Sequence, residues 1–103
     1  MRAVVITRHL AFDYGPRGVR VNAICPGGVD TPMIRTASAA GNAQGGEIAK
    51  LRAVHSAALQ ALMPIKRLSS AEEQAAAIAF LASDDASYIN GVSLDVNGGL
   101  FMA

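Results

Sequence analysis

Hydrophobic and polar side chains alternate along residues 19–25, and both faces of this segment contain apolar residues. One face carries Val19, Val21, Ala23 and Cys25, and the other carries Arg20, Asn22 and Ile24. Apolar residues on both faces are typical of a strand that is covered on both sides in a parallel sheet. Pro26 cannot donate to a strand ladder, so we expect the strand to cover residues 19–25. Gly27 and Gly28 then favour a sharp turn, at the edge of the sheet where open parallel sheets bind ligands.

Apolar residues recur every three or four positions in three other segments, which predicts amphipathic helices. These segments are residues 1–14, residues 47–63 and residues 70–83. Gly15-Pro16 predicts the end of the first helix, with the glycine in the left-handed conformation. The third helix follows two overlapping capping boxes, and its expected buried stripe consists of Ala71, Ala75, Ile78, Leu81 and Ala82. Residues 92–96 predict a second strand, followed by a turn at Asn97-Gly98-Gly99.

The order of these elements predicts a single α/β domain over residues 1–103. Residues 27–63 form its loop and helices between the first strand and the third helix. Strands separated by helical segments favour a parallel pair joined by a right-handed crossover. Two parallel strands with about three to four helices leave both outer strand edges unpaired, so we expect the fold to be incomplete on its own.

Composition excludes several classes of protein. The chain is 51% hydrophobic and 17% charged with a net charge of +1, which favours a packed globular chain and gives no basic stripe for nucleic acid. Cys25 is the only cysteine, so no internal disulfide can form, and we expect a reducing, cytoplasmic location. No apolar run approaches the roughly 20 residues that cross a bilayer, and the N-terminal residues do not resemble a signal peptide.

Outside the glycine turn, few side chains are candidates for a catalytic or metal-binding role. His9 has no second ligand three or four positions away, so a surface residue is favoured over a metal ligand, and we predict no metal site. Asp84 and Asp85 are adjacent and point apart, which favours a turn over an acid/base pair. Residues 36–46 are small and glycine-rich, and either a mobile lid or a connector without a role fits this composition.

Several short motifs follow one another in a specific order. They are Thr7-Arg8-His9-Leu10-Ala11, Tyr14-Gly15-Pro16-Arg17-Gly18, Val19-Arg20-Val21-Asn22-Ala23-Ile24, Pro26-Gly27 with Val29, Thr31 and Pro32, Pro64 with Arg67, Phe80-Leu81-Ala82-Ser83-Asp84, Ile89-Asn90-Gly91 and Val96-Asn97-Gly98-Gly99. Together they resemble the C-terminal part of a short-chain dehydrogenase/reductase. The resemblance implies the C-terminal portion of a Rossmann-type doubly wound parallel sheet, with the two strands as its sixth and seventh.

The resemblance also implies a partial cofactor site for NAD or NADP. Pro26 and Gly27 would border the nicotinamide ring, and the backbone of Val29 and the hydroxyl of Thr31 would bind its carboxamide. A carboxamide needs one donor and one acceptor, which these groups supply. Thr31 also fits a simple helix N-cap before Pro32. Residues 33–62 would form the substrate-binding region for a small carbonyl or alcohol.

The chain departs from the family in the residues that perform the chemistry. It contains no glycine-rich phosphate loop and no catalytic Ser, Tyr and Lys, because neither Tyr14 nor Tyr88 is followed by lysine four positions later. Hydride transfer to a carbonyl needs a positioned acid, so we predict no catalytic residue and no activity for this chain alone. We therefore expect a fragment of a longer oxidoreductase. The alternative is a non-catalytic module that pairs with itself or with a separate N-terminal half.

Overall fold

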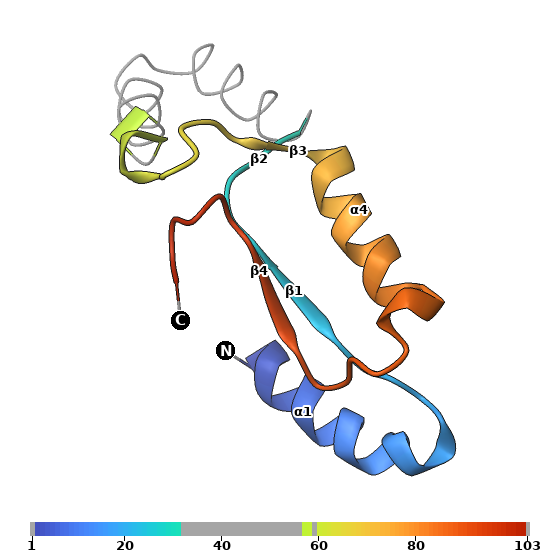
Figure 1. Cartoon of the computed structure of the whole chain (residues 1–103). Helices are drawn as coiled ribbons and strands as arrows, with labels where there is room; N and C mark the ends of the chain where they lie inside the picture. The colour runs from blue at the N-terminus through green and yellow to red at the C-terminus, as the bar shows by residue number, and fades with distance from the viewer. Residues whose placement is uncertain (1, 32–56, 59, 103) are drawn as a thin grey trace, which may run out of the picture. The chain divides into compact units, whose positions relative to one another are not determined.

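The computed structural model describes residues 2–31, 57–58 and 60–102. In chain order the elements are α1 (Arg2–Tyr14), the 3-10 turn η1 (Gly15–Arg17), β1 (Ala23–Pro26), β2 (Val29–Asp30), β3 (Ser69–Ser70), α4 (Ala71–Ala82), the 3-10 turn η2 (Asp84–Ala86) and β4 (Ser93–Val96) (Figure 1). Contacts divide the chain into two compact units, one of residues 1–26 with 72–96 and one of residues 27–71 with 97–103. We describe each unit by itself.

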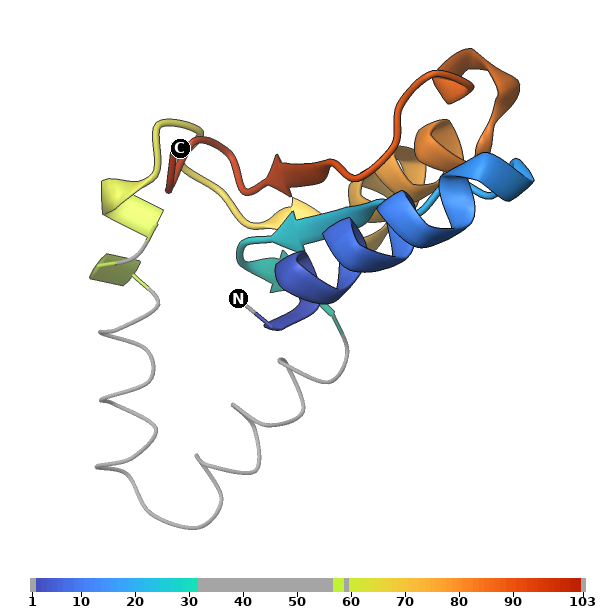
Figure 2. The ribbon, with the colours of Figure 1, turned by 90° about the horizontal axis from the view of Figure 1, so that it is seen from below.

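The first unit is built on the parallel pair of β1 and β4, in which Ala23 pairs with Ser93 and Pro26 pairs with Val96. Helices α1 and α4 lie on opposite sides of this pair (Figures 1 and 2). Parallel strands covered by helices on both sides are the arrangement expected of a doubly wound sheet. The predicted α/β class, with a partial parallel sheet, is therefore confirmed.

The end of α1 differs from the sequence expectation. Gly15 does not adopt the left-handed conformation; it begins the 3-10 turn η1, in which Pro16 occupies a position that needs no N–H donor. The left-handed residue is Gly18, with φ of 79°, and its N–H donates to the carbonyl of Gly15 at 2.9 Å. Gly15-Pro16 therefore ends α1 through a 3-10 turn, and the left-handed residue that closes this turn is Gly18.

Strand β1 begins four residues later than the pattern predicts and includes Pro26. Residues 19–22 are not in the ladder because side chains take the place of ladder partners. The N–H of Val21 donates to Oδ1 of Asn90, and Oδ1 of Asn22 accepts the N–H of Val92. Pro26 is compatible with the strand end because it needs no partner for an N–H.

The predicted buried stripe of α4 is also wrong in this chain. Ile78 is 53% exposed, Ala71, Ala75 and Ala82 are exposed, and the buried residue of the helix is Gln74, whose Nε2 donates to the carbonyl of Val96 at 3.0 Å. A sheet of two strands offers too little surface to cover the whole apolar face of a helix. Among the described residues, the buried apolar side chains are Ala11, Met63 and Ala86.

The second unit contains a two-residue parallel pair that the sequence pattern did not predict. Strand β2 pairs with β3, with Val29 opposite Ser69 and Asp30 opposite Ser70. Residues 57–58 and 60–62 are helical, as expected for the end of the predicted second helix, and the buried Met63 follows them. The rest of that helix and the glycine-rich segment 36–46 lie outside the described residues.

Candidate functional site

The glycine turn, Gly27-Gly28, follows β1 at its carboxyl end. Neither glycine has a positive φ, so the left-handed conformation does not explain them. A Cβ at Gly27 would lie 2.9 Å from Cβ and 3.0 Å from Cα of Asn97, and a Cβ at Gly28 would lie 2.6 Å from Cδ2 of Leu68. Real Cβ atoms do not approach other atoms so closely. Close packing within the second unit therefore requires glycine at position 27, where backbone atoms of Asn97 are in the way, whereas at position 28 the obstacle is the end of the Leu68 side chain.

The backbone of Val29 is oriented by the short pairing of β2 and β3. Ser69 N–H donates to the carbonyl of Gly28 at 3.0 Å, so this carbonyl is directed toward β3. In a parallel ladder, successive residues direct their N–H and C=O groups alternately to the two sides of the strand. The N–H and C=O of Val29 are consequently directed away from β3, where they provide a donor and an acceptor close together.

The predicted cofactor-binding residues occupy the continuous segment 26–31. Pro26 is the exposed last residue of β1 and belongs to the first unit. Gly27, Val29 and Thr31 are half-buried and belong together in the second unit. The helix that Thr31 would cap falls on residues 32–56, outside the described part, so both interpretations of its hydroxyl stay predictions.

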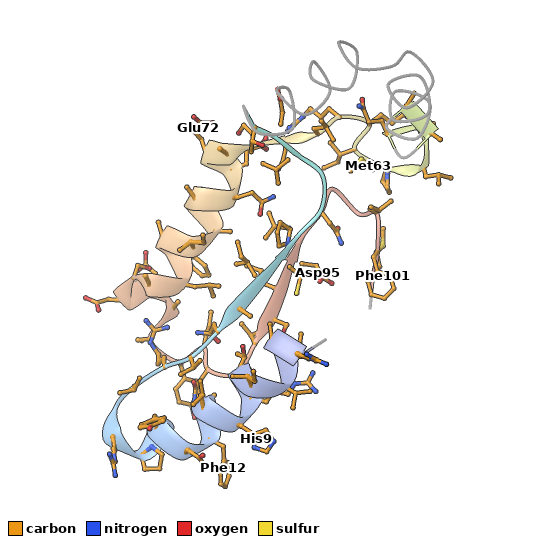
Figure 3. The ribbon with its side chains drawn as sticks, turned by 180° about the vertical axis from the view of Figure 1, so that it is seen from behind. His9, Phe12, Met63, Glu72, Asp95 and Phe101 are labelled. Atoms are coloured by element: carbon orange, nitrogen blue, oxygen red, sulfur yellow. The ribbon has the colours of Figure 1, made fainter. Side chains whose placement is uncertain are left out.

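Titratable side chains do not gather into a site within the described residues. No group of three or more His, Cys, Asp and Glu is placed to hold a metal ion in that part of the chain. Figure 3 shows His9 on α1, directed away from β1 and β4 together with Phe12. Asp84 and Asp85 lie in the η2 turn, and Cys25 is half-buried in β1. None of the described helices is sufficiently long and apolar to cross a membrane.

Sequence reasoning missed the part played by Asn97. It noted this residue only as one position of a motif at the end of the second strand. The structure places its Cα and Cβ against Gly27, and its Oδ1 accepts the N–H of Gly99 at 3.0 Å. The signal in the sequence was the Asn-Gly-Gly turn at the end of a strand that pairs in parallel with the strand before the glycine turn.

Comparisons with known proteins match almost the whole chain. The family model described as enoyl-(acyl carrier protein) reductase matches residues 3–101. A 3-oxoacyl-(acyl-carrier-protein) reductase of Pseudomonas aeruginosa is 39% identical over 97 residues, which are 94% of this chain and 34% of that protein. A 3beta-hydroxysteroid dehydrogenase of Eggerthella lenta is 41% identical over 96 residues, which are 93% of this chain and 32% of that protein.

A solved structure has the same arrangement of elements. The crystal structure of a 3-oxoacyl-(acyl-carrier protein) reductase from Brucella melitensis superposes with a TM-score of 0.78 at 33% identity. The superposition covers 99% of this chain and 33% of that structure. The chain thus spans about a third of the length of the relatives it matches.

Parallel strands between two helices, with a glycine turn at the carboxyl end of β1, define the C-terminal part of a Rossmann-type fold. The family model extends from α1 to the residues after β4. The chain belongs to the short-chain dehydrogenase/reductase family of oxidoreductases.

Proposed function

We propose that this chain supplies the nicotinamide-facing side of an oxidoreductase that transfers a hydride between NAD or NADP and a carbonyl or alcohol. Membership of the family and the glycine turn at the carboxyl end of β1 support this proposal. Open parallel sheets bind dinucleotides at that edge. The relatives named above reduce a 3-oxoacyl group or act on a hydroxysteroid, which are carbonyl and alcohol chemistry of this kind.

The orientation of Val29 is the observation that supports the proposed site most directly. Its N–H and C=O are directed away from β3, as the hydrogen bond from Ser69 to Gly28 implies. In the proposed site these groups bind the carboxamide together with the Thr31 hydroxyl, while Pro26 and Gly27 border the ring. Gly27 lies beside Asn97, where a side chain has no room.

The 103 residues lack the paired tyrosine and lysine that would donate the proton. No tyrosine is followed by lysine four positions later, and there is no glycine-rich phosphate loop before the first strand. Binding the nicotinamide end of a cofactor therefore does not lead to turnover by this chain, since reduction of a carbonyl requires a positioned acid. We place the chain in the cytoplasm because its single cysteine favours a reducing compartment.

Turnover is tested by the absorbance of reduced nicotinamide with the purified 103-residue chain. A 3-oxoacyl thioester and a ketosteroid serve as substrates, and NADH and NADPH as cofactors. We expect no loss of absorbance beyond that of the protein-free control. A rate that is proportional to protein concentration would refute the proposed absence of catalytic groups.

The second candidate function is a non-catalytic module that pairs with another copy or with a separate N-terminal half. It is favoured by exposed apolar side chains on one face of α1, where Val5 is 54% and Phe12 is 84% exposed and both line the same shallow hollow. Large apolar side chains that adjoin one another on a helix are typical of interaction surfaces. Association in solution tests this candidate, and a monomer at all concentrations would count against it.

A further inference from the structure

Asn97 is the centre of a small hydrogen-bonded turn formed by residues 97–102, which we name the C-terminal turn. Its Nδ2 donates to the carbonyl of Phe101 at 2.9 Å, and its Oδ1 accepts the N–H of Gly99 at 3.0 Å. Its own carbonyl accepts the N–H of Leu100 at 3.2 Å. Three bonds from one residue fix the side chain and the backbone of Asn97 at the same time.

The C-terminal turn is fixed to the segment before β3. Ile65 N–H donates to the carbonyl of Gly98 at 3.0 Å. Gly99, with φ of 86°, lies so close to Pro64 that a Cβ would be 2.9 Å from its Cγ. Gly98 and Gly99 are both in the left-handed conformation. Because neither has a side chain, this backbone can approach Pro64 and Ile65 closely. The turn is thus held by the Asn97 side chain, the backbone N–H of Ile65 and the ring of Pro64.

The glycine turn lies directly against this fixed residue. A Cβ added to Gly27 would lie 2.9 Å from Cβ and 3.0 Å from Cα of Asn97, so the backbone of Gly27 packs against this residue. Gly27 has little room to move toward Asn97. The carbonyl of the next residue, Gly28, accepts the N–H of Ser69, which further restrains the glycine turn. Gly27 thus packs against a residue that is 70 positions later in the sequence.

We propose that Asn97 is a positioning residue. Through its contact with Gly27, it keeps the glycine turn where the nicotinamide ring can lie against it. The inference rests on the proposed function of the glycine turn. We propose no direct contact between Asn97 and the cofactor. An asparagine suits the role because it offers one donor and one acceptor, and the two bonds to Phe101 and Gly99 need one of each.

The test compares Asn97→Asp with Asn90→Asp in the 103-residue chain. Both side chains donate Nδ2 to a backbone carbonyl, of Phe101 and Ala11 respectively, and accept a backbone N–H through Oδ1. In each variant a carboxylate oxygen replaces the donor and repels the carbonyl, with almost no change in volume. Asn90 belongs to the first unit and Asn97 to the second, so Asn90→Asp is the matched control.

Amide hydrogen exchange gives the first measurement, without any cofactor. We expect Asn97→Asp to accelerate exchange about tenfold at Ile65, Leu100 and Ser69, which donate to Gly98, Asn97 and Gly28. Asn90→Asp should leave these three amides unchanged and accelerate Gly91. Unchanged exchange at Ser69 in Asn97→Asp would overturn the inference, because the glycine turn would then be independent of Asn97.

NADH affinity, followed by the intensity of the reduced nicotinamide fluorescence, gives the second measurement. We expect it to fall about tenfold in Asn97→Asp and to stay unchanged in Asn90→Asp. An equal loss in both variants would overturn the positioning role, since general destabilisation would explain it. Absence of NADH binding by the unaltered chain would refute the proposed function, while exchange at Ser69 would still decide whether Asn97 holds the glycine turn.

Discussion

Glycines in this chain are needed for two different physical reasons. Gly18 has φ of 79° and no atom within 4 Å of an added Cβ, so its requirement is conformational. Gly27 has an ordinary φ and no space, because Asn97 occupies the direction of its Cβ. Gly28 also lacks space, but its neighbour is the end of the flexible Leu68 side chain. Glycine is therefore needed at position 18 for its backbone conformation and at position 27 for lack of space.

Alanine substitutions separate these reasons. Gly27→Ala should lower the free energy of unfolding by about 1–3 kcal/mol, because backbone and Cβ atoms of Asn97 must move. Gly18→Ala should cost roughly 1–2 kcal/mol through left-handed strain alone. Gly28→Ala should cost less than Gly27→Ala, since Leu68 can change rotamer. Urea denaturation followed by circular dichroism measures all three, and equal costs at Gly27 and Gly28 would contradict the packing explanation.

Arg20 joins the elements of the first unit at the amino end of the strands. Its guanidinium donates to the carbonyls of Leu81 at 2.8 Å, Ser83 at 3.2 Å and Ile89 at 3.4 Å. The first two acceptors are at the C-terminal end of α4, where carbonyls lack helical partners and cations are favourable. Arg20 thus connects the segment before β1 to the end of α4.

Removal of this cation should loosen the end of α4. Arg20→Met keeps most of the apolar stem and loses the three bonds, and we expect a loss of about 2 kcal/mol in the free energy of unfolding. Arg20→Lys should recover only part of it, because an ammonium does not have the fork geometry of a guanidinium. Amide exchange at Ser83 and Ala86 should accelerate in both variants. Full stability in Arg20→Lys would contradict the need for the three guanidinium hydrogen bonds at the end of α4.

Sequence patterns predicted local elements better than contacts between them. The helix ends at Tyr14 and Ala82 and the strand at Ser93–Val96 agree with the pattern to within one residue. The start of β1 was wrong because Asn90 and Asn22 side chains replace ladder partners across about seventy residues of sequence. The need for glycine at position 27 depends on Asn97, and no local pattern contains that contact.

Large apolar side chains are more often exposed than buried in the part of the chain that the structure describes. In the described residues, large exposed side chains include Phe12 at 84% and Leu62 at 75%, while Met63 is the one large side chain that is fully buried. In Figure 3, Phe12 is directed away from the strands. Exposed large apolar side chains favour association, which is what the second candidate function predicts.

Solution mass tests the second candidate function at this scale. If α1 mediates association, light scattering should give a mass of at least two chains. Phe12→Ser should then reduce association without lowering the stability of the monomer, since the ring makes little contact within its own chain. Tyr88→Ser removes a fully exposed aromatic ring at another place and is the control. A monomer at all concentrations would contradict the interaction module.

Nicotinamide contact by the glycine turn is the central claim, and a titration of the ¹⁵N-labelled chain with NADH tests it most directly. We expect amide shift changes concentrated at Gly27, Gly28, Val29 and Thr31, with none at Gly91 at the opposite end of the β1–β4 pair. Oxidised NAD should affect the same residues, because the carboxamide is common to both forms. Shift changes centred on α1 or η2, or no change at residues 27–31 at millimolar NADH, would contradict the account.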